Sequence, residues 1–196
     1  RYGIGVFGRV RPDKGSDIYV EAMLELLPDF PDYTAVIAGL CQPQHEAFKQ
    51  SLMDKVAYAC ASKHAGTYVV TVTVEGVHFL QPIEVGELVS LHASINYVGR
   101  SSMVVGIRVI AENVRTGVQK HTNTSYFTMV AKDDNGKPAE VPILELEDRN
   151  DVRRCLEAIK RKQLKEAYKD DFDNEKSSMH LEDNIHLLTT ERVIVK

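Results

Sequence analysis

Apolar and polar residues alternate with two different periods along the chain. Near the N-terminus, apolar runs at 3–8 and 33–40 flank a segment at 15–27 whose apolar residues have helical spacing. Ser16 is suited to cap this helix, and Pro28 ends it. A strand, a helix and a second strand in this order predict one parallel βαβ unit, which needs cover on both faces of its sheet.

The period changes to two after a second helical segment at 45–66. Four long segments of alternating apolar and polar residues follow, with short turns between them, at 67–80, 86–99, 101–114 and 117–134. The helix is apolar nearly all round from Leu52 to Ala61, so we expect it to be almost completely buried. One apolar helix followed by an antiparallel meander predicts an α+β fold in which the sheet curls around the helix.

A further helix is predicted at 150–168. Its apolar residues share one side, and we expect that side to pack on the domain or on a partner subunit; they are Val152, Leu156, Ile159 and Ala167. Its many lysines and arginines are expected to be solvated rather than to form a binding site. Residues 169–184 are acidic and polar and are expected to be mobile. The last residues, 191–196, are expected to form a small edge strand or no element.

The composition is that of an ordinary globular protein, with 43% hydrophobic and 27% charged residues among 196. A net charge of −4 and a pI near 6.0 do not indicate the excess of positive charge that is typical of nucleic-acid-binding proteins. No apolar run approaches the roughly 18 to 20 residues that span a bilayer, so we expect no membrane span. The chain opens with Arg1 rather than Met and shows no signal peptide, which indicates a fragment of a longer sequence.

The cysteines are three in number, widely spaced, and form no CxxC pair: Cys41, Cys60 and Cys155. This pattern favours reduced thiols in the cytoplasm over a disulfide framework or a metal site. Cys60 lies among alanines and is expected to behave as a small hydrophobic residue rather than as a catalytic thiol, because nothing local would lower its pKa.

Four segments match one known family in order and spacing: "LMDKVAYACASKH" (52–64), "VVTVTVEGVHFLQPIEVGE" (69–87), "VGRSSM" (98–103) and "FTMVAKDDNGKPAEVP" (127–142). From about residue 52 to 165 the chain resembles the hotdog-fold acyl-CoA thioesterases of the hexameric bacterial type. The resemblance implies a long helix wrapped by an antiparallel sheet, and an active site where two subunits pair their sheets. It also implies acyl-CoA as substrate, no cofactor beyond CoA as part of that substrate, and self-association as a dimer or a trimer of dimers.

By this resemblance Asp54 is the catalytic acid, which acts as base for water or as nucleophile on the thioester carbonyl. A carboxylate in the first turns of a buried helix is costly unless it has a function or a partner, which agrees with that role. The alternative is that Asp54 pairs with Lys55 or with a residue across the dimer. Thr71 and Val72 correspond to the family's "VT" and are expected to line the acyl channel or the dimer seam.

The sequence "GRSS" supplies the expected CoA site, which consists of Gly99, Arg100, Ser101 and Ser102. Arg100 follows a glycine at a turn between strands, so its guanidinium can face a phosphate, and the serines add hydroxyl and backbone donors. The alternative for an isolated motif of this kind is a turn arginine in a surface ion pair. His64 and His78 are expected to be structural, because the resemblance assigns neither a proton-transfer role.

The first fifty residues resemble an unrelated family. "IGVFGRVRPDKGSDIYVEAMLELLPDFPDYTAVIAGL" is similar to the retaining glycosyltransferases with two Rossmann-like domains, especially the lipopolysaccharide-core mannosyltransferases. In that family Arg9 and Lys14 would hold the diphosphate of a nucleotide sugar beside a helix N-terminus. One βαβ unit cannot build a transferase site, so the match implies ancestry rather than activity.

The two patterns meet between about Gln50 and Met53, and the chain is therefore predicted to be a fusion. We expect a glycosyltransferase-like fragment at 1–50, a hotdog domain at 51–148, and a C-terminal helix with a polar tail at 149–196. The thioesterase family normally has a strand, an Asn-bearing loop and a Gly-Gly pair before its helix, whereas Glu46 and Ala47 stand where the glycines would fall.

Two consequences follow for fold and function. The strand at 33–40 is predicted to take the sheet edge that the missing strand would leave unpaired. The predicted function is acyl-CoA thioester hydrolysis, impaired to an unknown degree because loss of one oxyanion donor costs roughly 10²–10³ in rate. The alternatives are a non-catalytic acyl-CoA binding module and a remnant of a sugar-nucleotide transferase.

Overall fold

The computed structural model describes residues 2–7, 15–26, 33–38, 46–84, 87–180, 184–190 and 192–193. In chain order the elements are β1 (Tyr2–Phe7), α1 (Ser16–Leu26), β2 (Tyr33–Ala38), α2 (Glu46–Ala65), β3 (Val69–Phe79), β4 (Glu87–Val98), β5 (Ser102–Asn113), β6 (Gln119–Ala131), α3 (Arg149–Ser178) and the 3₁₀ helix η4 (Ile185–Thr190). Arg9, Lys14 and Cys41 lie outside the described residues, as does the side chain of His78. The predictions that concern them remain predictions.

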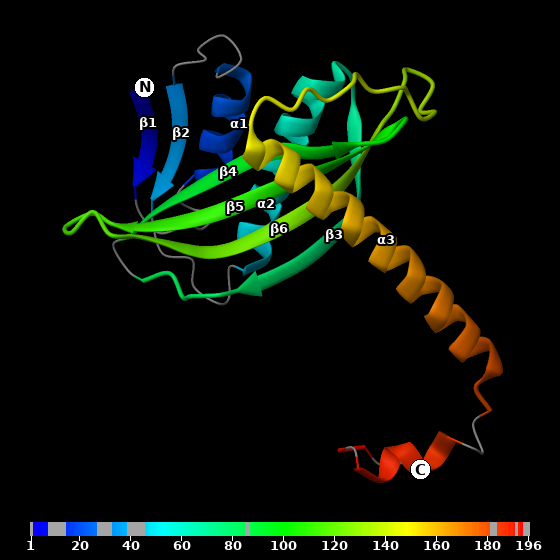
Figure 1. The fold of residues 1–196 in the computed structure, drawn as a ribbon. Coiled ribbons are helices and arrows are strands. Elements are labelled where there is room, and N and C mark those ends of the chain that lie inside the picture. The colour runs from blue at the N-terminus through cyan, green and yellow to red at the C-terminus, as the bar shows by residue number, and fades with distance from the viewer. Residues whose placement is uncertain are drawn as a thin grey trace.

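Six strands form one sheet in the order β1-β2-β4-β5-β6-β3 (Figure 1). β1 and β2 are parallel, and all other neighbours are antiparallel. β2 joins the antiparallel part through Ile37 opposite Val89 and Ala38 opposite Leu88. The predicted βαβ unit is therefore an extension of the larger sheet. The prediction that the strand at 33–40 takes this edge is confirmed through Ile37 and Ala38, the two residues of β2 that pair with β4.

The core lies between one face of β3–β6 and the long helix α2. The inward residues of β5 and β6 are buried because their alternation brings every second side chain to this face; they are Met103, Val105, Ile107, Val109, Phe127, Met129 and Ala131. Met53, Ala57 and Ala61 of α2 pack against them. A long helix wrapped by an antiparallel sheet is the predicted α+β architecture, which is confirmed.

Burial of α2 is less complete than predicted. Leu52, Met53, Ala57 and Ala61 are buried, but Tyr58 is 38% exposed and its ring lies 6.0 Å from that of Tyr68. α1 packs on α2 as well, and Lys55 of α2 forms an ion pair with Glu21 of α1. α2 is therefore covered by the sheet on one side and partly by α1 on another, and a strip of it stays accessible.

α3 crosses the outer face of the sheet, opposite α2 (Figure 1). It begins after Asp148, whose side chain accepts a hydrogen bond from the N–H of Asp151 at 2.8 Å. The helix runs ten residues beyond the predicted end and includes residues 169–178, whose expected mobility stays a prediction. Pairs one turn apart, such as Arg153 with Glu157, stabilise a helix that has few apolar contacts.

The predicted apolar side of α3 does not pack on this domain, and its alternative, a contact with a partner subunit, stays a prediction. Val152 and Leu156 are 44% and 61% exposed, whereas Ala158 is buried. The side that meets the sheet carries cations: the guanidinium of Arg161 lies 3.6 Å from the ring centroid of Tyr126. The outer sheet face presents aromatic rings and carboxylates there, and the stems of basic residues pack on such a surface as well as apolar side chains do.

Among the described residues no helix is long and apolar enough to cross a membrane. At the C-terminus, Arg192 and Val193 belong to no strand, and residues 194–196 lie outside the described part. The predicted terminal edge strand is therefore not tested over its full length.

Candidate active site

Asp54 is the ninth residue of α2 and is half-buried. The prediction that it lies in the first turns of its helix is wrong, because α2 begins at Glu46 and Asp54 belongs to the third turn. At a rise of 1.5 Å per residue, about 8–12 Å of helix axis separates it from the four free N–H groups at the start of α2. These donors and the Asp54 carboxylate of one subunit therefore do not face the same atom.

Thr71 of β3 holds the Asp54 carboxylate. Its hydroxyl donates a hydrogen bond to Oδ1 of Asp54 at 2.7 Å and lies 3.3 Å from the sulfur of Met129. No other hydrogen bond to the Asp54 carboxylate is found in the described part of the chain, so Oδ2 is open to a substrate or a water. The arrangement can position a carboxylate and leave its reactive oxygen free.

A β-bulge explains why Thr71 and Thr73 point to opposite faces of the sheet. Thr71 pairs with Met129 of β6 and Thr73 pairs with the next residue, Thr128, so Val72 is an extra residue in β3. The bulge reverses the alternation of side chains. Thr71 consequently faces α2, whereas the hydroxyl of Thr73 faces α3 and lies 3.3 Å from Nζ of Lys165.

β3 is also the outermost strand on its side of the sheet. Beside Thr71, the side chains of Val72 and Val74 are 56% and 44% exposed. An unpaired strand with exposed valines is a surface that a second sheet can extend. The predicted role of Thr71 and Val72 at an acyl channel or dimer seam stays a prediction. The contact between Thr71 and Asp54 was missed, since a bulge leaves no mark in composition.

Lys55 is not the partner of Asp54, because its ammonium pairs with Glu21. One of the two structural alternatives for Asp54 is thereby excluded within this chain. The other alternative, a partner residue across a dimer, concerns a second copy.

The turn between β4 and β5 carries the predicted CoA residues. The N–H of Gly99 donates to the carbonyl oxygen of Ser102 at 2.7 Å, and a Cβ added at Gly99 would lie 2.8 Å from Oγ of Ser102, so the tight turn favours glycine. Carbonyl oxygens of Arg100 and Ser101 accept hydrogen bonds from Val141 and Ala131. The turn is therefore fixed to its surroundings through its backbone, which leaves its side chains available.

Arg100 is exposed, and within the described ranges its guanidinium makes no ion pair, which weighs against the surface ion-pair alternative. Ser102 is opposite Val130 of β6, which is in turn opposite Val70 of β3. Only β6 separates the turn from β3, a distance of about 10 Å. Asp54, Thr71 and the turn at 99–102 therefore lie at the same end of the sheet.

Two other groups fit structural roles. Nε2 of His64 lies 3.1 Å from the carbonyl oxygen of Pro142.

Burial raises the pKa of the Cys60 thiol to about 11, against a smaller opposing effect of Lys63, so the thiol stays protonated at neutral pH. Among the residues that the structure describes, no three His, Cys, Asp or Glu side chains converge as metal ligands do.

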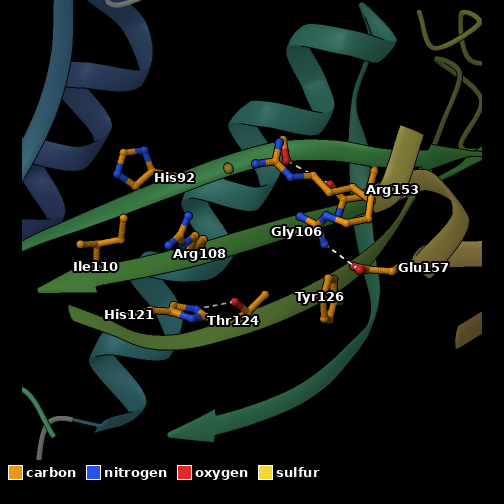
Figure 2. Close-up of a pocket in the computed structure, with 13 residues that line it drawn as sticks. His92, Gly106, Arg108, Ile110, His121, Thr124, Tyr126, Arg153 and Glu157 are labelled. Carbon is orange, nitrogen blue, oxygen red and sulfur yellow. Dashed lines mark hydrogen bonds and ion pairs between the residues drawn. The ribbon is translucent and has the colours of Figure 1, made fainter. Parts of the chain in front are cut away.

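A hollow of about 710 Å³ lies on the opposite face of the sheet, between β4–β6 and the first turns of α3 (Figure 2). His92 and Arg108 are cross-strand neighbours there, and the pKa of His92 is lowered by burial and by Arg108. The sheet separates this hollow from Asp54. We call it the outer groove; sequence analysis did not predict it, although His92 and Arg108 occupy outward positions of their strands.

Comparison with known proteins gives the family. The family model described as "Thioesterase superfamily" matches residues 47–118. Protein VdlD of Helicobacter pylori is 46% identical over 115 residues, which are 59% of this chain and 66% of VdlD. The chain thus spans just under two thirds of that relative.

Solved structures agree. The crystal structure of an apo-hexameric acyl-CoA thioesterase superposes with a TM-score of 0.60 and 33% identity, over 63% of this chain and 79% of the other. The Staphylococcus aureus acyl-CoA hydrolase was solved with butyryl-CoA, CoA and CoA disulfide. It superposes with a TM-score of 0.62 and 30% sequence identity, over 69% of this chain and 85% of the hydrolase. Variants of that enzyme in which one Asp, one Thr or one Asn is replaced by Ala have also been solved, the last in complex with CoA.

The second resemblance is also found, over a short segment. A lipopolysaccharide core mannosyltransferase of Rhizobium meliloti, LpsB, is 46% identical over 56 residues, which are 29% of this chain and 16% of LpsB. So small a share of a transferase carries no statement about transferase activity. The thioesterase likeness, by contrast, covers most of two solved enzymes and shares their fold: the chain belongs to the thioesterase superfamily.

Proposed function

We propose that this protein hydrolyses acyl-CoA thioesters, with the Asp54 carboxylate as general base for water or as nucleophile on the carbonyl carbon. The observation that carries the proposal is the hydrogen bond from Thr71 to Asp54 beside the exposed edge of β3. It fixes the orientation of one carboxylate oxygen and leaves the other free, as positioned catalysis requires.

The spacing of the site supports the proposal. In the Staphylococcus aureus hydrolase, the Asp and the Thr that were replaced by Ala are seventeen residues apart, as are Asp54 and Thr71. The Asn precedes that Asp by fifteen residues, and the corresponding position here is Gly39. Two of the three side chains probed in that enzyme are therefore present in this chain at the same separation.

An oligomer completes the site in this proposal. The N–H groups that begin α2 lie about 8–12 Å along the axis from Asp54 of the same subunit, so donors for the thioester oxygen come from a second copy. Pairing of two sheets along β3 brings such donors near. One similar structure is that of a hexameric acyl-CoA thioesterase, and we expect a dimer or a trimer of dimers here.

A second candidate, a non-catalytic acyl-CoA binding module, is favoured by Glu46 and Ala47 at the start of α2 and by Gly39 in place of an Asn. The CoA complex of the Asn variant in the similar enzyme indicates that binding of CoA does not need that Asn. We also expect a cytoplasmic location, since Cys60 and Cys155 are free thiols.

Thr71→Val is expected to lower kcat for acyl-CoA hydrolysis about 10- to 100-fold, because a hydrogen bond to a charged group contributes about 1.5–3 kcal/mol. Valine keeps the shape and removes the donor. The matched control is Thr73→Val, whose hydroxyl lies on the other face of the sheet near Lys165. Steady-state release of free CoA thiol measures both variants, and equal losses in the two would contradict a specific role for Thr71.

Arg100→Gln is expected to raise the KM for acyl-CoA about tenfold with little change in kcat, because the guanidinium would contact a phosphate and not the reacting carbonyl. The control is a substrate without the nucleotide, such as an S-acyl pantetheine. On that substrate the variant and the unaltered protein should perform alike. If Arg100→Gln impairs both substrates equally, the turn at 99–102 does not bind the nucleotide.

A further inference from the structure

The stripe of α3 that packs on the sheet does not end where the sheet ends. The residues of this stripe follow alternate spacings of four and three. Arg154, Ala158, Arg161 and Lys165 lie over the sheet, and Tyr168, Phe172 and Glu175 continue in the same phase beyond it. Lys165 is the last to contact the sheet, through Glu75 and Thr73 of the outermost strand. Beyond it, every residue of α3 is exposed.

This overhanging half of α3, residues 166–178, carries features of an interface. Tyr168 and Phe172 are 68% and 51% exposed, and their rings stack at 6.0 Å. The segment holds five carboxylates against two lysines. An isolated helix of this composition is only marginally stable in water, so packing against another surface would stabilise it. Its aromatic pair lies on the side that would contact a sheet if the sheet continued past β3.

The outer groove is complementary to that half-helix. Arg153 and Arg154 at its wall pair with Glu157 and Asp151, at 2.6 Å and 3.6 Å. Arg108 on its floor finds no carboxylate in the described part of the chain. A Cβ at Gly106 would lie 2.4 Å from Nδ2 of Asn96, so glycine at this position leaves room for the buried Asn96 side chain at the floor of the groove. The groove thus offers a cation without an ion pair among the described residues. Of the five carboxylates of the overhang, Glu166 pairs with Lys162 at 3.9 Å and the other four are exposed, so the two surfaces are complementary in charge.

We propose that the overhanging half of α3 docks in the outer groove of a second copy of this chain. The inference rests on the proposed pairing of two sheets along β3. Thirteen residues beyond Lys165 reach about 20 Å, and the partner's β5, with its Arg108, lies three strand spacings or about 14 Å from β3. The contact is isologous, so each subunit gives its helix to the other and the two copies of α3 run antiparallel across the seam.

In the docked arrangement Tyr168 and Phe172 cover the partner's sheet beside Tyr126, and Glu175 with the flanking Asp171 meets the cations of the groove. Asp170 and Asp173 point away from the sheet, because they lie on the opposite side of the helix. These two residues supply a control of equal charge.

Photo-cross-linking of the full chain tests the proposal. Benzoylphenylalanine is introduced at position 172, with position 170 as control, in oligomers mixed from ¹⁴N- and ¹⁵N-labelled chains. We expect position 172 to cross-link to peptides of the other label that contain Arg108 or Thr124, and position 170 to give less than about a tenth of that yield. Cross-links from position 172 only within one label, or only to other surfaces, would overturn the docking.

Charge reversal supplies a second, independent measurement. Asp171→Lys with Glu175→Lys should weaken subunit association about tenfold, and adding Arg108→Glu should restore most of it, whereas Asp170→Lys with Asp173→Lys should have little effect. Equal weakening by the two pairs would refute the docking. Acyl-CoA hydrolysis is measured on the same samples, so that the two proposals are tested separately. An active oligomer without the cross-link would reject only the docking of α3. An inactive monomer would reject the proposed function as well.

Discussion

Asp54→Asn is expected to lower kcat for acyl-CoA hydrolysis by about 10²–10⁴-fold, the contribution of a positioned acid–base group. The amide keeps the shape of the side chain and can still accept a hydrogen bond from Thr71, so the fold of the site is retained. It can neither take a proton from water nor attack a carbonyl carbon. Because binding of CoA depends on other residues, KM should change little. The measurement is the steady-state release of CoA thiol over a series of acyl-CoA concentrations.

The control is an aspartate of similar chemistry elsewhere. Asp134→Asn alters an exposed turn acid between β6 and α3, and it should leave kcat unchanged. Thermal unfolding of both variants checks that neither is misfolded. An Asp54→Asn protein that is folded and keeps more than about a tenth of the kcat would show that catalysis uses another group.

Phe127→Ala is expected to lower the free energy of unfolding by about 3–5 kcal/mol, the usual cost of removing a large buried aromatic side chain. Phe127 is fully buried and lies between Val105 of β5 and Val74 of β3, in the layer that faces α2. The cavity left there would adjoin β3, so association of subunits should weaken as well. Urea denaturation followed by circular dichroism measures the change.

Thr128 offers a matched comparison, because it follows Phe127 on the same strand and points to the other face. It is half-buried, and Thr128→Ala should cost less than about 1 kcal/mol. Similar costs for the two substitutions would contradict the assignment of the core to the α2 side of the sheet.

The strands could be read from the sequence because one face of each is held against α2. β5 packs against α2 only if its inward residues are apolar, as Met103, Val105 and Ile107 are. The sequence therefore shows an apolar residue at every second position. Even the edge position of residues 33–38 follows from the same reasoning, since a strand next to the antiparallel sheet needs a partner for its backbone.

The candidate site was harder to predict because its geometry depends on one inserted residue. Val72 bulges out of the ladder, so the alternation of β3 before and after it differs. Nothing in the composition of "VVTVTVE" marks that insertion, and Thr71 and Thr73 look equivalent in the sequence. The bulge makes one of them a partner of Asp54 and the other a partner of Lys165.

α3 shows where the rule of amphipathic helices fails. The rule assumes that the apolar side of a helix packs on the protein. It therefore predicts that Val152 and Leu156 contact the sheet. The outer sheet face instead presents Tyr126 and Glu75, to which cationic side chains bind. The interpretation of the basic side of α3 as merely solvated is therefore wrong for Arg161 and Lys165, which make these contacts.

One paired experiment distinguishes a hydrolase from a binding module. Binding of CoA by calorimetry and release of thiol from acyl-CoA are measured on the same preparation of the unaltered chain, beside Asp54→Asn. We expect both proteins to bind CoA and only the unaltered chain to hydrolyse the thioester. Binding of CoA by the unaltered chain without hydrolysis above the buffer rate would contradict this expectation.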